Sequence, residues 1–346
     1  MNDLELDHPF VSVVLPVRNE GRSFASTLDA VLGQDYPAER MEVLVVDGMS
    51  TDSTRAVVRD LAAKDSRLQL LENPGLIVPH AMNRGIAAAR GEFLVRIDGH
   101  TIVANDYVSR CVAAWKQSGA ECVGGRMDPV GATTVGRLVA LATSSPFGIG
   151  NSHFHYGREP RFTDSVYLGA WPLDVLKRLS GFDEEMVRNQ DDELNYRLRK
   201  NGGRVFLDPS IRSRYTPRGS LSRLWRQYYQ YGFWKVRILQ KHPTMMSARH
   251  FAPSAFVLGA AAVAVAAVVS PWGRLVLALG FGAYLLGAWF AAARLPGRRV
   301  ERAALPLVFF VLHAAYGFGL LVGLFRFFGY WFDRKSKRDL AGRHAA

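Results

Sequence analysis

The feature that most constrains the fold of this chain is an alternation of strand-like and helix-like segments over residues 11–125. The strand-like runs are residues 11–15, 42–46, 68–71, 93–97 and 121–123, and the helix-like segments are residues 23–32, 52–63, 79–90 and 106–117. Strands that alternate with helices of about 10–15 residues indicate βαβ units and a parallel sheet. We therefore predict an α/β domain whose right-handed crossovers bring the carboxyl ends of the strands to one edge.

Acidic side chains stand where three of these patterns stop or start. Asp47 ends one strand-like run, Asp98 ends another, and Asp191 opens a later helical pattern. Ligands of open α/β sheets bind at the carboxyl ends of the strands, where carboxylates suit a metal, a sugar-nucleotide and an acceptor hydroxyl. This arrangement indicates a transferase. The first strand is followed by no GxGxxG pattern, and the chain has no GxxxxGK[ST] phosphate loop.

Polar residues after the first two strands are candidates for binding a nucleotide. Asn19 and Glu20 follow the first strand and Asp47 ends the second, and their side chains suit hydrogen bonds to a base and a ribose. The alternative for Asp47 is a turn residue ahead of the helix that begins near Asp52, which would itself cap that helix.

The segment Asp98-Gly99-His100 is the candidate metal element. A carboxylate and an imidazole two residues apart on a turn can face one divalent cation, which would neutralise the charge of a departing nucleotide. The alternative is an ordinary Asp-Gly turn. Arg96 lies in an otherwise apolar strand, and a buried arginine needs an anionic partner. Asp98 or a phosphate group would serve as that partner.

The run Asp191-Asp192-Glu193 offers a general base. One base and one good leaving group suffice for a single inverting displacement, and repulsion between neighbouring carboxylates would raise the pKa of one of them. The alternative is that acidic residues at a helix N-terminus complement the helix dipole. We prefer that alternative for Asp192 and Glu193.

The segments on either side of this acidic run differ in regularity. Residues 144–151 are rich in turn-forming residues, and we predict a mobile loop over the site there. The helix that begins near Asp191 is predicted to carry a basic outer face, formed by Arg197, Arg199 and Lys200.

The charge of the chain favours a membrane surface over nucleic acid as a partner. There are 43 lysines and arginines against 31 acidic residues, a formal net charge of +12, and the basic residues gather beside long apolar runs in the C-terminal part, as in juxtamembrane segments. The two cysteines, Cys111 and Cys122, form no metal-binding pair and are expected to be reduced and buried. Residues 1–10 contain no apolar signal-peptide core, so we expect the first half to stay cytosolic.

The C-terminal part is predicted to associate with a membrane. Residues 217–250 form an amphipathic pattern of aromatic and basic residues, typical of a helix in the membrane interface; the alternative is a helix packed on the soluble domain. Three apolar segments of a length that crosses a bilayer follow, and a basic tail ends the chain. The segments are residues 251–269, 275–293 and 303–325 within a transmembrane region of residues 251–333, and the tail is residues 334–346.

The orientation of these segments raises a conflict. The arginines of residues 294–302 place the loop between the second and third segments inside. Three crossings from a cytosolic first half would then leave the basic tail outside, against the same rule. Either the rule is overridden or one segment is re-entrant or interfacial. His313 is the ionisable residue within a span, and it either hydrogen-bonds to a neighbouring helix or has a functional role.

Together these motifs closely resemble those of the family 2 glycosyltransferases of GT-A fold. The resemblance covers about residues 10–240, and its motifs are Val13–Glu20, Val45–Asp52, Asp98–His100, Gly181–Glu184 and Gln190–Arg197. The chain looks most similar to the membrane-anchored, succinoglycan-type exopolysaccharide glycosyltransferases. That similarity lies in residues 96–100, 144–151, 167–172 and 227–232.

The resemblance implies a mixed, mainly parallel GT-A sheet domain over residues 1–216, a nucleotide-sugar donor of the UDP-hexose kind, and inversion at the anomeric carbon. Asp191 falls on the catalytic base, and Asp98 and His100 fall on the metal motif for Mn²⁺ or Mg²⁺. The residues expected to bind the nucleotide-sugar are Pro16, Arg18, Asn19, Glu20, Asp47, Arg96 and Asp98.

Three positions depart from the family pattern. His100 replaces a second aspartate, and an imidazole nitrogen favours Mn²⁺ over Mg²⁺. Gln190 replaces the usual glutamate beside the base, and Phe233 stands where the QxxRW motif of processive synthases has arginine. The last departure, with only three apolar segments, argues against a polymer-extruding synthase.

We therefore expect a multi-pass protein of the plasma or inner membrane with a cytoplasmic catalytic domain. It would add one sugar to a polyprenyl-diphosphate-linked saccharide during surface polysaccharide assembly, with membrane lipids and no nucleic acid among its partners. One alternative is a transferase onto polyprenyl monophosphate; another is a catalytically inactive membrane scaffold. The residues expected to contact the acceptor or the membrane interface are Trp171, Arg226, Gln227, Gln230 and Trp234.

Overall fold

The computed structural model describes residues 8–150 and 152–332, which divide into two compact units. The first unit contains residues 8–128 and 153–215, and the second contains the remaining described residues. Residues 129–152, which we expected within the first domain, therefore group with the C-terminal helices. The predicted basic tail, residues 334–346, lies outside the described residues.

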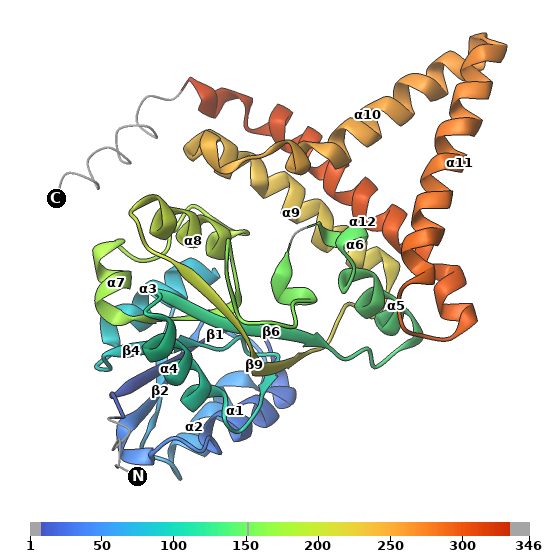
Figure 1. Ribbon diagram of the computed structural model, residues 1–346. Coiled ribbons are helices and arrows are strands. Elements are labelled where there is room, and N and C mark those ends of the chain that lie inside the picture. Colours follow the sequence, from blue (N-terminus) through green and yellow to red (C-terminus); the bar gives the residue numbers. More distant parts are fainter. Residues whose placement is uncertain (1–7, 151, 333–346) are drawn as a thin grey trace. The chain divides into compact units, whose positions relative to one another are not determined.

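The first unit is built on a mixed sheet with the strand order β3-β2-β1-β4-β8-β6-β9-β5, in which β7 pairs with β9. Strands β1 to β4 run parallel to one another, and β4 to β9 form antiparallel pairs. The predicted GT-A-like sheet is thus confirmed (Figure 1). The strands are β1 (Val11–Val17), β2 (Met41–Asp47), β3 (Leu68–Glu72), β4 (Phe93–Arg96), β5 (Thr101–Val103), β6 (Cys122–Pro129), β7 (Arg161–Thr163), β8 (Tyr167–Pro172) and β9 (Val205–Tyr215).

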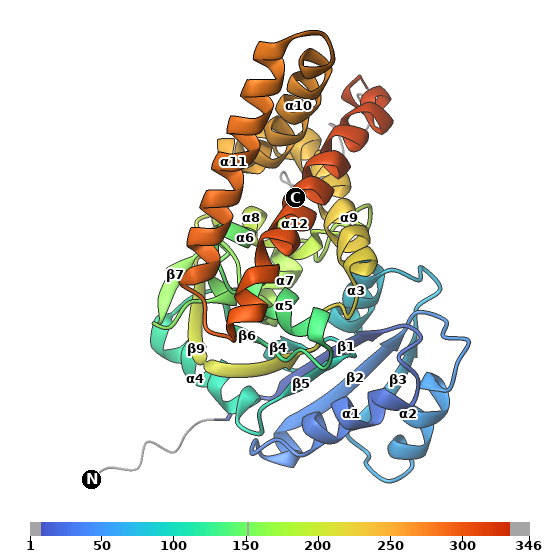
Figure 2. The ribbon, with the colours of Figure 1, turned by 90° about the vertical axis from the view of Figure 1, so that its right-hand side faces the viewer.

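Helices cover both faces of this sheet, which explains why β1 and β2 are mostly apolar on both faces. Every residue of β1 and β2 is buried. Because side chains alternate along a strand, Val13 packs against one layer of helices and Val14 against the other. The first layer contains α1 (Phe24–Leu32), α2 (Thr54–Ala62) and α4 (Tyr107–Ser118), and the second contains α3 (Val78–Ala88), α7 (Leu173–Arg178) and α8 (Gln190–Lys200). Figure 2 shows α1 and α2 together on one side of the strands.

The second unit is helical. Its helices are α5 (Thr134–Thr143), α6 (Pro146–Ile149), α9 (Leu221–Lys241), α10 (Ala248–Val269), α11 (Pro271–Ala293) and α12 (Arg299–Arg326). By length and composition α10, α11 and α12 are each sufficient to cross a membrane, at the places where the three apolar segments were predicted. In the two units together, short 3-10 helices lie at Gly21–Ser23, Ala38–Arg40, His153–His155, Pro243–Met245 and Phe328–Trp331.

The predicted mobile loop at residues 144–151 contains instead the short helix α6, which is packed within the second unit. Phe147 of α6 lies edge-on to Phe309 of α12, with ring centroids 5.0 Å apart. His313 of α12 forms hydrogen bonds with the Phe147 carbonyl oxygen (2.8 Å) and the Tyr284 hydroxyl of α11 (3.0 Å). The prediction that His313 hydrogen-bonds to a neighbouring helix is therefore confirmed, and this contact ties α6, α11 and α12 together.

Candidate active site

The register of the parallel strands brings three loops to one edge of the sheet. Val17 at the end of β1 pairs with Asp47 at the end of β2, and Val14 pairs with Arg96 at the end of β4. The loop after β4 approaches the loop after β1 closely, because a Cβ added to Gly99 would lie 2.8 Å from the Val17 side chain. The polar residues that follow these strands consequently share one edge.

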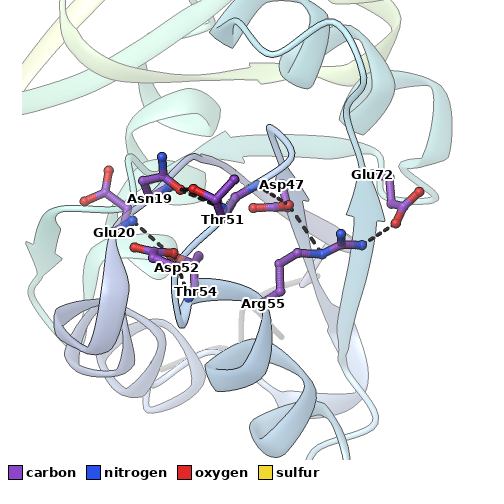
Figure 3. A network of polar contacts seen from close by, with 9 residues as sticks. Asn19, Glu20, Asp47, Thr51, Asp52, Thr54, Arg55 and Glu72 are labelled. Carbon is purple, nitrogen blue, oxygen red and sulfur yellow. Dashed lines mark hydrogen bonds and ion pairs between the residues drawn. The ribbon is translucent and has the colours of Figure 1, made fainter.

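Hydrogen bonds between side chains and backbone join the loop after β1 to the loop after β2 (Figure 3). Asn19 accepts a hydrogen bond at Oδ1 from the Thr51 amide (2.9 Å), and its own amide donates to Ser50 Oγ (2.9 Å). The hydroxyl of Thr54 accepts from the amides of Glu20 and Gly21, each at 2.9 Å. Asn19 thus has a structural role that fixes this edge, in addition to the nucleotide-binding role expected of it.

Asp47 is fully buried and only partly satisfied by protein groups. Its Oδ2 accepts from the Ser50 amide (3.0 Å) and lies 3.6 Å from Arg55 Nε. Its Oδ1 is buried and has no hydrogen-bond partner among the described residues. A buried acceptor without a donor costs free energy, about 1–3 kcal/mol. A ligand N–H group at this position would satisfy it.

One buried guanidinium joins the two other acidic residues. Arg96 is almost fully buried, and its Nε donates to Asp98 Oδ1 (2.9 Å) while its Nη1 donates to Asp191 Oδ1. Asp98 lies two residues beyond β4, and Asp191 lies in the first turn of α8. The structure therefore brings Arg96, Asp98 and Asp191 together, although 95 positions separate Arg96 from Asp191 in the sequence.

The start of α8 is held by a second buried ion pair. Arg197 Nε lies 2.6 Å from Glu193 Oε1, and Arg197 Nη2 also donates to the Gly181 carbonyl oxygen (2.8 Å). Asn83 of α3 holds the same turn through the Phe182 amide (2.7 Å). The prediction that Arg197 belongs to an exposed basic face is wrong, because this carboxylate and carbonyl draw it into the interior.

The environment of Asp191 changes its acidity. Its side chain is 40% exposed, but the carboxyl group is packed round with protein, and this loss of solvation raises its pKa to about 6. The guanidinium of Arg96 opposes the shift, and the carboxylates of Asp98 and Asp192 add to it. The carboxylates of Asp191 and Asp98 outweigh the effect of burial on Arg96 and raise its pKa, so Arg96 remains charged.

Asp98 and His100, the two residues expected to hold a metal, are both partly exposed. The Asp98 and His100 side chains are 22% and 42% exposed, and His100 Nδ1 lies 3.8 Å from Glu20 Oε1. Over the described ranges, no three or more histidine, cysteine, aspartate or glutamate side chains gather closely enough to hold an ion by themselves. A cation bound by one or two side chains takes its other ligands from substrate phosphates and water. The donor set therefore suits a metal that arrives with a diphosphate.

The remaining predicted nucleotide residues, Pro16 and Arg18, lie at the end of β1 and in the loop after it. Pro16 is buried within the strand, and Arg18 is exposed, with its side chain beside Gly48. Thr54 and Arg55 of α2 were not among the predicted site residues; Thr54 accepts a hydrogen bond from the Glu20 amide, and Arg55 lies beside the Asp47 carboxylate. Their one sequence signal is their place at the start of the helix that follows Asp47.

The residues predicted to contact an acceptor or the membrane interface differ in their burial and in the unit to which they belong. Trp171 of β8 is 1% exposed and packs edge-on against Phe182, with ring centroids 6.0 Å apart. It belongs to the core, so the structure contradicts its predicted surface role. The other four lie on α9 in the second unit: Arg226 is exposed, and Gln227, Gln230 and Trp234 are partly buried.

The mixed, mainly parallel sheet, with acidic residues and a buried arginine at the carboxyl edge of its parallel strands, has the GT-A fold. Residues 12–165 match the model of Glycosyl transferase family 2. The chain is 33% identical over 260 residues to the succinoglycan biosynthesis protein ExoA of Rhizobium meliloti, covering 74% of this chain and 78% of that protein. The chain belongs to family 2 of the glycosyltransferases.

Further comparisons agree with this assignment. A Methanococcus voltae glucuronosyltransferase that acts on a dolichyl N-acetyl-α-D-glucosaminyl phosphate is 28% identical over 240 residues, covering 67% of this chain and 74% of that enzyme. Among solved structures, the mannosyltransferase PcManGT from Pyrobaculum calidifontis, in complex with GDP-Man and Mn²⁺, superposes with a TM-score of 0.66 at 22% identity, over 92% of this chain and 88% of that one. That likeness establishes the fold.

The pKa of Asp191 predicts the acid limb of the pH–rate profile. Asp191 is the expected general base and would act as its carboxylate, so we expect kcat/KM for transfer to fall about tenfold per pH unit below about pH 6. Removing the neighbouring charge with Asp192→Asn should move this limb to lower pH, because Asp192 raises the pKa of Asp191. Initial rates between pH 4.5 and 8 test this. A flat profile, or an Asp192→Asn limb at higher pH, would contradict it.

Proposed function

We propose that this family 2 glycosyltransferase is an inverting enzyme that moves one sugar from a nucleotide-sugar to a polyprenyl-diphosphate-linked saccharide. The expected donor is a UDP-hexose, and the expected pathway is the assembly of exopolysaccharide or another cell-surface polysaccharide. The observation that carries the proposal is the shared contact of Asp98 and Asp191 with buried Arg96. This contact joins a candidate metal ligand and a candidate base to one cation.

The donor's nucleotide is proposed to bind over the joined loops after β1 and β2. The unpaired, buried Oδ1 of Asp47 supports this position, because a pyrimidine ring N–H would supply the missing donor. Arg18, Asn19 and Glu20 border the same edge. A solved complex of similar fold adds support: TarS of Staphylococcus aureus, with UDP bound, superposes with a TM-score of 0.52 at 17% identity over 91% of both chains.

A divalent metal is proposed to bind with the donor, held by Asp98 and His100. When bound, such an ion neutralises the charge of the diphosphate leaving group. The mixed carboxylate and imidazole donor set favours Mn²⁺ over Mg²⁺. Arg96 adds a fixed positive charge beside Asp98, so this edge is prepared for an anionic donor before the metal arrives.

Asp191 is proposed to act as the base in a single displacement. The acceptor hydroxyl gives its proton to Asp191 Oδ2, the oxygen other than the one that accepts from Arg96, as the hydroxyl oxygen attacks the anomeric carbon. The bond from that carbon to the diphosphate breaks, and the configuration inverts. Arg96 orients the carboxylate, and the raised pKa of Asp191 makes it a better proton acceptor at neutral pH than an ordinary aspartate.

The acceptor is proposed to be lipid-linked because the chain carries helices suited to a membrane. The apolar helices α10 and α11 are mostly exposed, and α9 has aromatic and basic residues typical of a membrane interface. The relatives named for succinoglycan biosynthesis and for a dolichyl-linked substrate add support. We place the enzyme in the plasma or inner membrane with its catalytic unit on the cytoplasmic side.

The metal proposal predicts that transfer stops when EDTA removes divalent ions and resumes with Mn²⁺. His100→Ala should raise the dissociation constant of the donor at least about tenfold, equivalent to about 1.4 kcal/mol. The matched control is His80→Ala, because His80 of α3 pairs with Glu184 at 3.2 Å instead. Calorimetric titration of the nucleotide-sugar measures both variants. Full turnover in EDTA would overturn the metal role.

The acceptor proposal predicts strong discrimination between acceptors by the full chain in nanodiscs. With a panel of nucleotide-sugars, radiolabelled sugar should pass to a polyprenyl-diphosphate-linked saccharide and not to the same saccharide free in solution. Equal transfer to both would contradict a lipid-linked acceptor. Transfer to polyprenyl monophosphate, giving a phosphodiester-linked monosaccharide, would favour that alternative enzyme, and no transfer at all would favour the inactive scaffold.

A further inference from the structure

The three apolar helices of the second unit differ in how much protein covers them. In the most apolar stretch of each helix, only 6% of the residues of α10 and 11% of those of α11 are buried, whereas half of those of α12 are buried. The distal halves of α10 and α11 expose large apolar side chains, among them Val268 at 83% and Trp272 at 76%. Such exposure suits lipid contact over the whole circumference of the hairpin. α12 has a different environment.

α12 packs against the end of the α10–α11 hairpin that lies opposite the turn between these two helices. The base of α10 meets the second half of α12, where a Cβ added to Gly317 would lie 2.2 Å from the Pro253 carbonyl oxygen. The base of α11 meets the first half of α12, where Ala288 and Ala292 pack with Leu305. Figure 1 shows α10 and α11 running to a shared tip while α12 closes the opposite, open end. α12 therefore connects the N-terminal end of α10 with the C-terminal end of α11.

α9 runs beside α12 in the same direction. A Cβ added to Gly319 would lie 2.1 Å from the Tyr229 carbonyl oxygen, and further along both helices Gln240 Nε2 donates to the Phe327 carbonyl oxygen (2.8 Å). The contact at Tyr229 and the contact at Gln240 are 11 residues apart on α9, which corresponds to about 16 Å along the helix axis. The close backbone approach at glycine prevents one helix from tilting independently of the other. The two helices consequently share one orientation relative to a bilayer.

α9 is unsuited to crossing a bilayer. It carries five basic residues and no acidic one in 21 residues, at Arg223, Arg226, Lys235, Arg237 and Lys241. Charges within a membrane span are expensive and rare, whereas basic residues interleaved with aromatic ones suit the headgroup region. Because α12 follows the direction of α9, the position of α9 at the headgroups determines that of α12.

We propose that α12 lies along the membrane surface beside α9 and that only the α10–α11 hairpin crosses the bilayer. α10 has 22 residues and α11 has 23, about 33 Å each, enough for a hydrocarbon core of about 30 Å. The exposed face of α12, which includes Phe318 and Phe325, then contacts acyl chains from the side. This inference rests on the membrane association in the proposed function, but on no step of its chemistry.

Two crossings also remove the conflict in charge. With two crossings, Arg249 in the first turn of α10, the arginines of residues 294–302 and the basic run of residues 334–338 in the sequence would all fall on one side, as the positive-inside rule requires. Three crossings would put the last of these on the opposite side. The surface formed by α9 and α12 thereby offers a basic, aromatic platform to anionic headgroups.

Single cysteines and a membrane-impermeant maleimide test this topology in the full chain. Background labelling should be low, because Cys111 and Cys122 are fully buried and burial raises the pKa of both thiols. The variants are Ser270→Cys at the hairpin tip, Ala346→Cys at the end of the chain, and Ala63→Cys on the surface of the first unit as reference. Labelling is compared between intact cells and inverted membrane vesicles.

We expect Ser270→Cys to be labelled in intact cells, and Ala346→Cys and Ala63→Cys to be labelled only in inverted vesicles. Labelling of Ala346→Cys in intact cells would show that α12 crosses and would overturn the proposal. Labelling of Ser270→Cys from the same side as Ala63→Cys would also overturn it. Green fluorescent protein fused after residue 346 gives a second readout, since it should fluoresce only on the cytoplasmic side. A chain inactive in transfer still gives a decisive labelling pattern, so the two proposals fail separately.

Discussion

The site depends on one buried cation, the guanidinium of Arg96. A charge in the interior of a protein is costly unless it is paired and hydrogen-bonded, and Arg96 obtains both from Asp98 and Asp191. The cost of burying the arginine is thus offset only when β4 and the start of α8 stand side by side. Removing either carboxylate would leave a buried charge with half of its compensation.

The rest of the first unit can be understood as support for this contact. The parallel strands place Asp47 and Arg96 at one edge, and hydrogen bonds of Asn19 and Thr54 hold the adjoining loops. On the other side, the Glu193–Arg197 pair fixes the first turn of α8 through the Gly181 carbonyl. Polar groups that are satisfied by protein keep the edge rigid, while Asp47 Oδ1 is left for a ligand.

Much of this arrangement was predictable from the sequence, because strand periodicity locates the sheet edge and acidic residues at strand ends stand out. The sequence also predicted that Arg96 needs an anion, but Asp191 was not foreseen as one, since no local pattern links residues so far apart. Trp171 and Arg197 were misplaced for a related reason: an aromatic or basic residue is buried when a distant partner covers it, and periodicity does not report distant partners. The segment 144–151 looked like a loop because its short helix is stabilised by packing against α12, as Phe147 shows.

The central claim is that Asp191, held by Arg96, is the base of the transfer reaction, and a pair of variants on one helix turn tests it. Asp191→Asn keeps the shape and a hydrogen-bond acceptor for Arg96 but removes the base, whereas Asp192→Asn changes a neighbouring carboxylate to which we assign no proton transfer. Turnover at pH 7.5 and donor binding are measured for both. We expect Asp191→Asn to lower kcat by about 10²–10⁴-fold while still binding donor, and Asp192→Asn to retain kcat. Near-normal turnover by Asp191→Asn, or an equal loss in both variants, would contradict it.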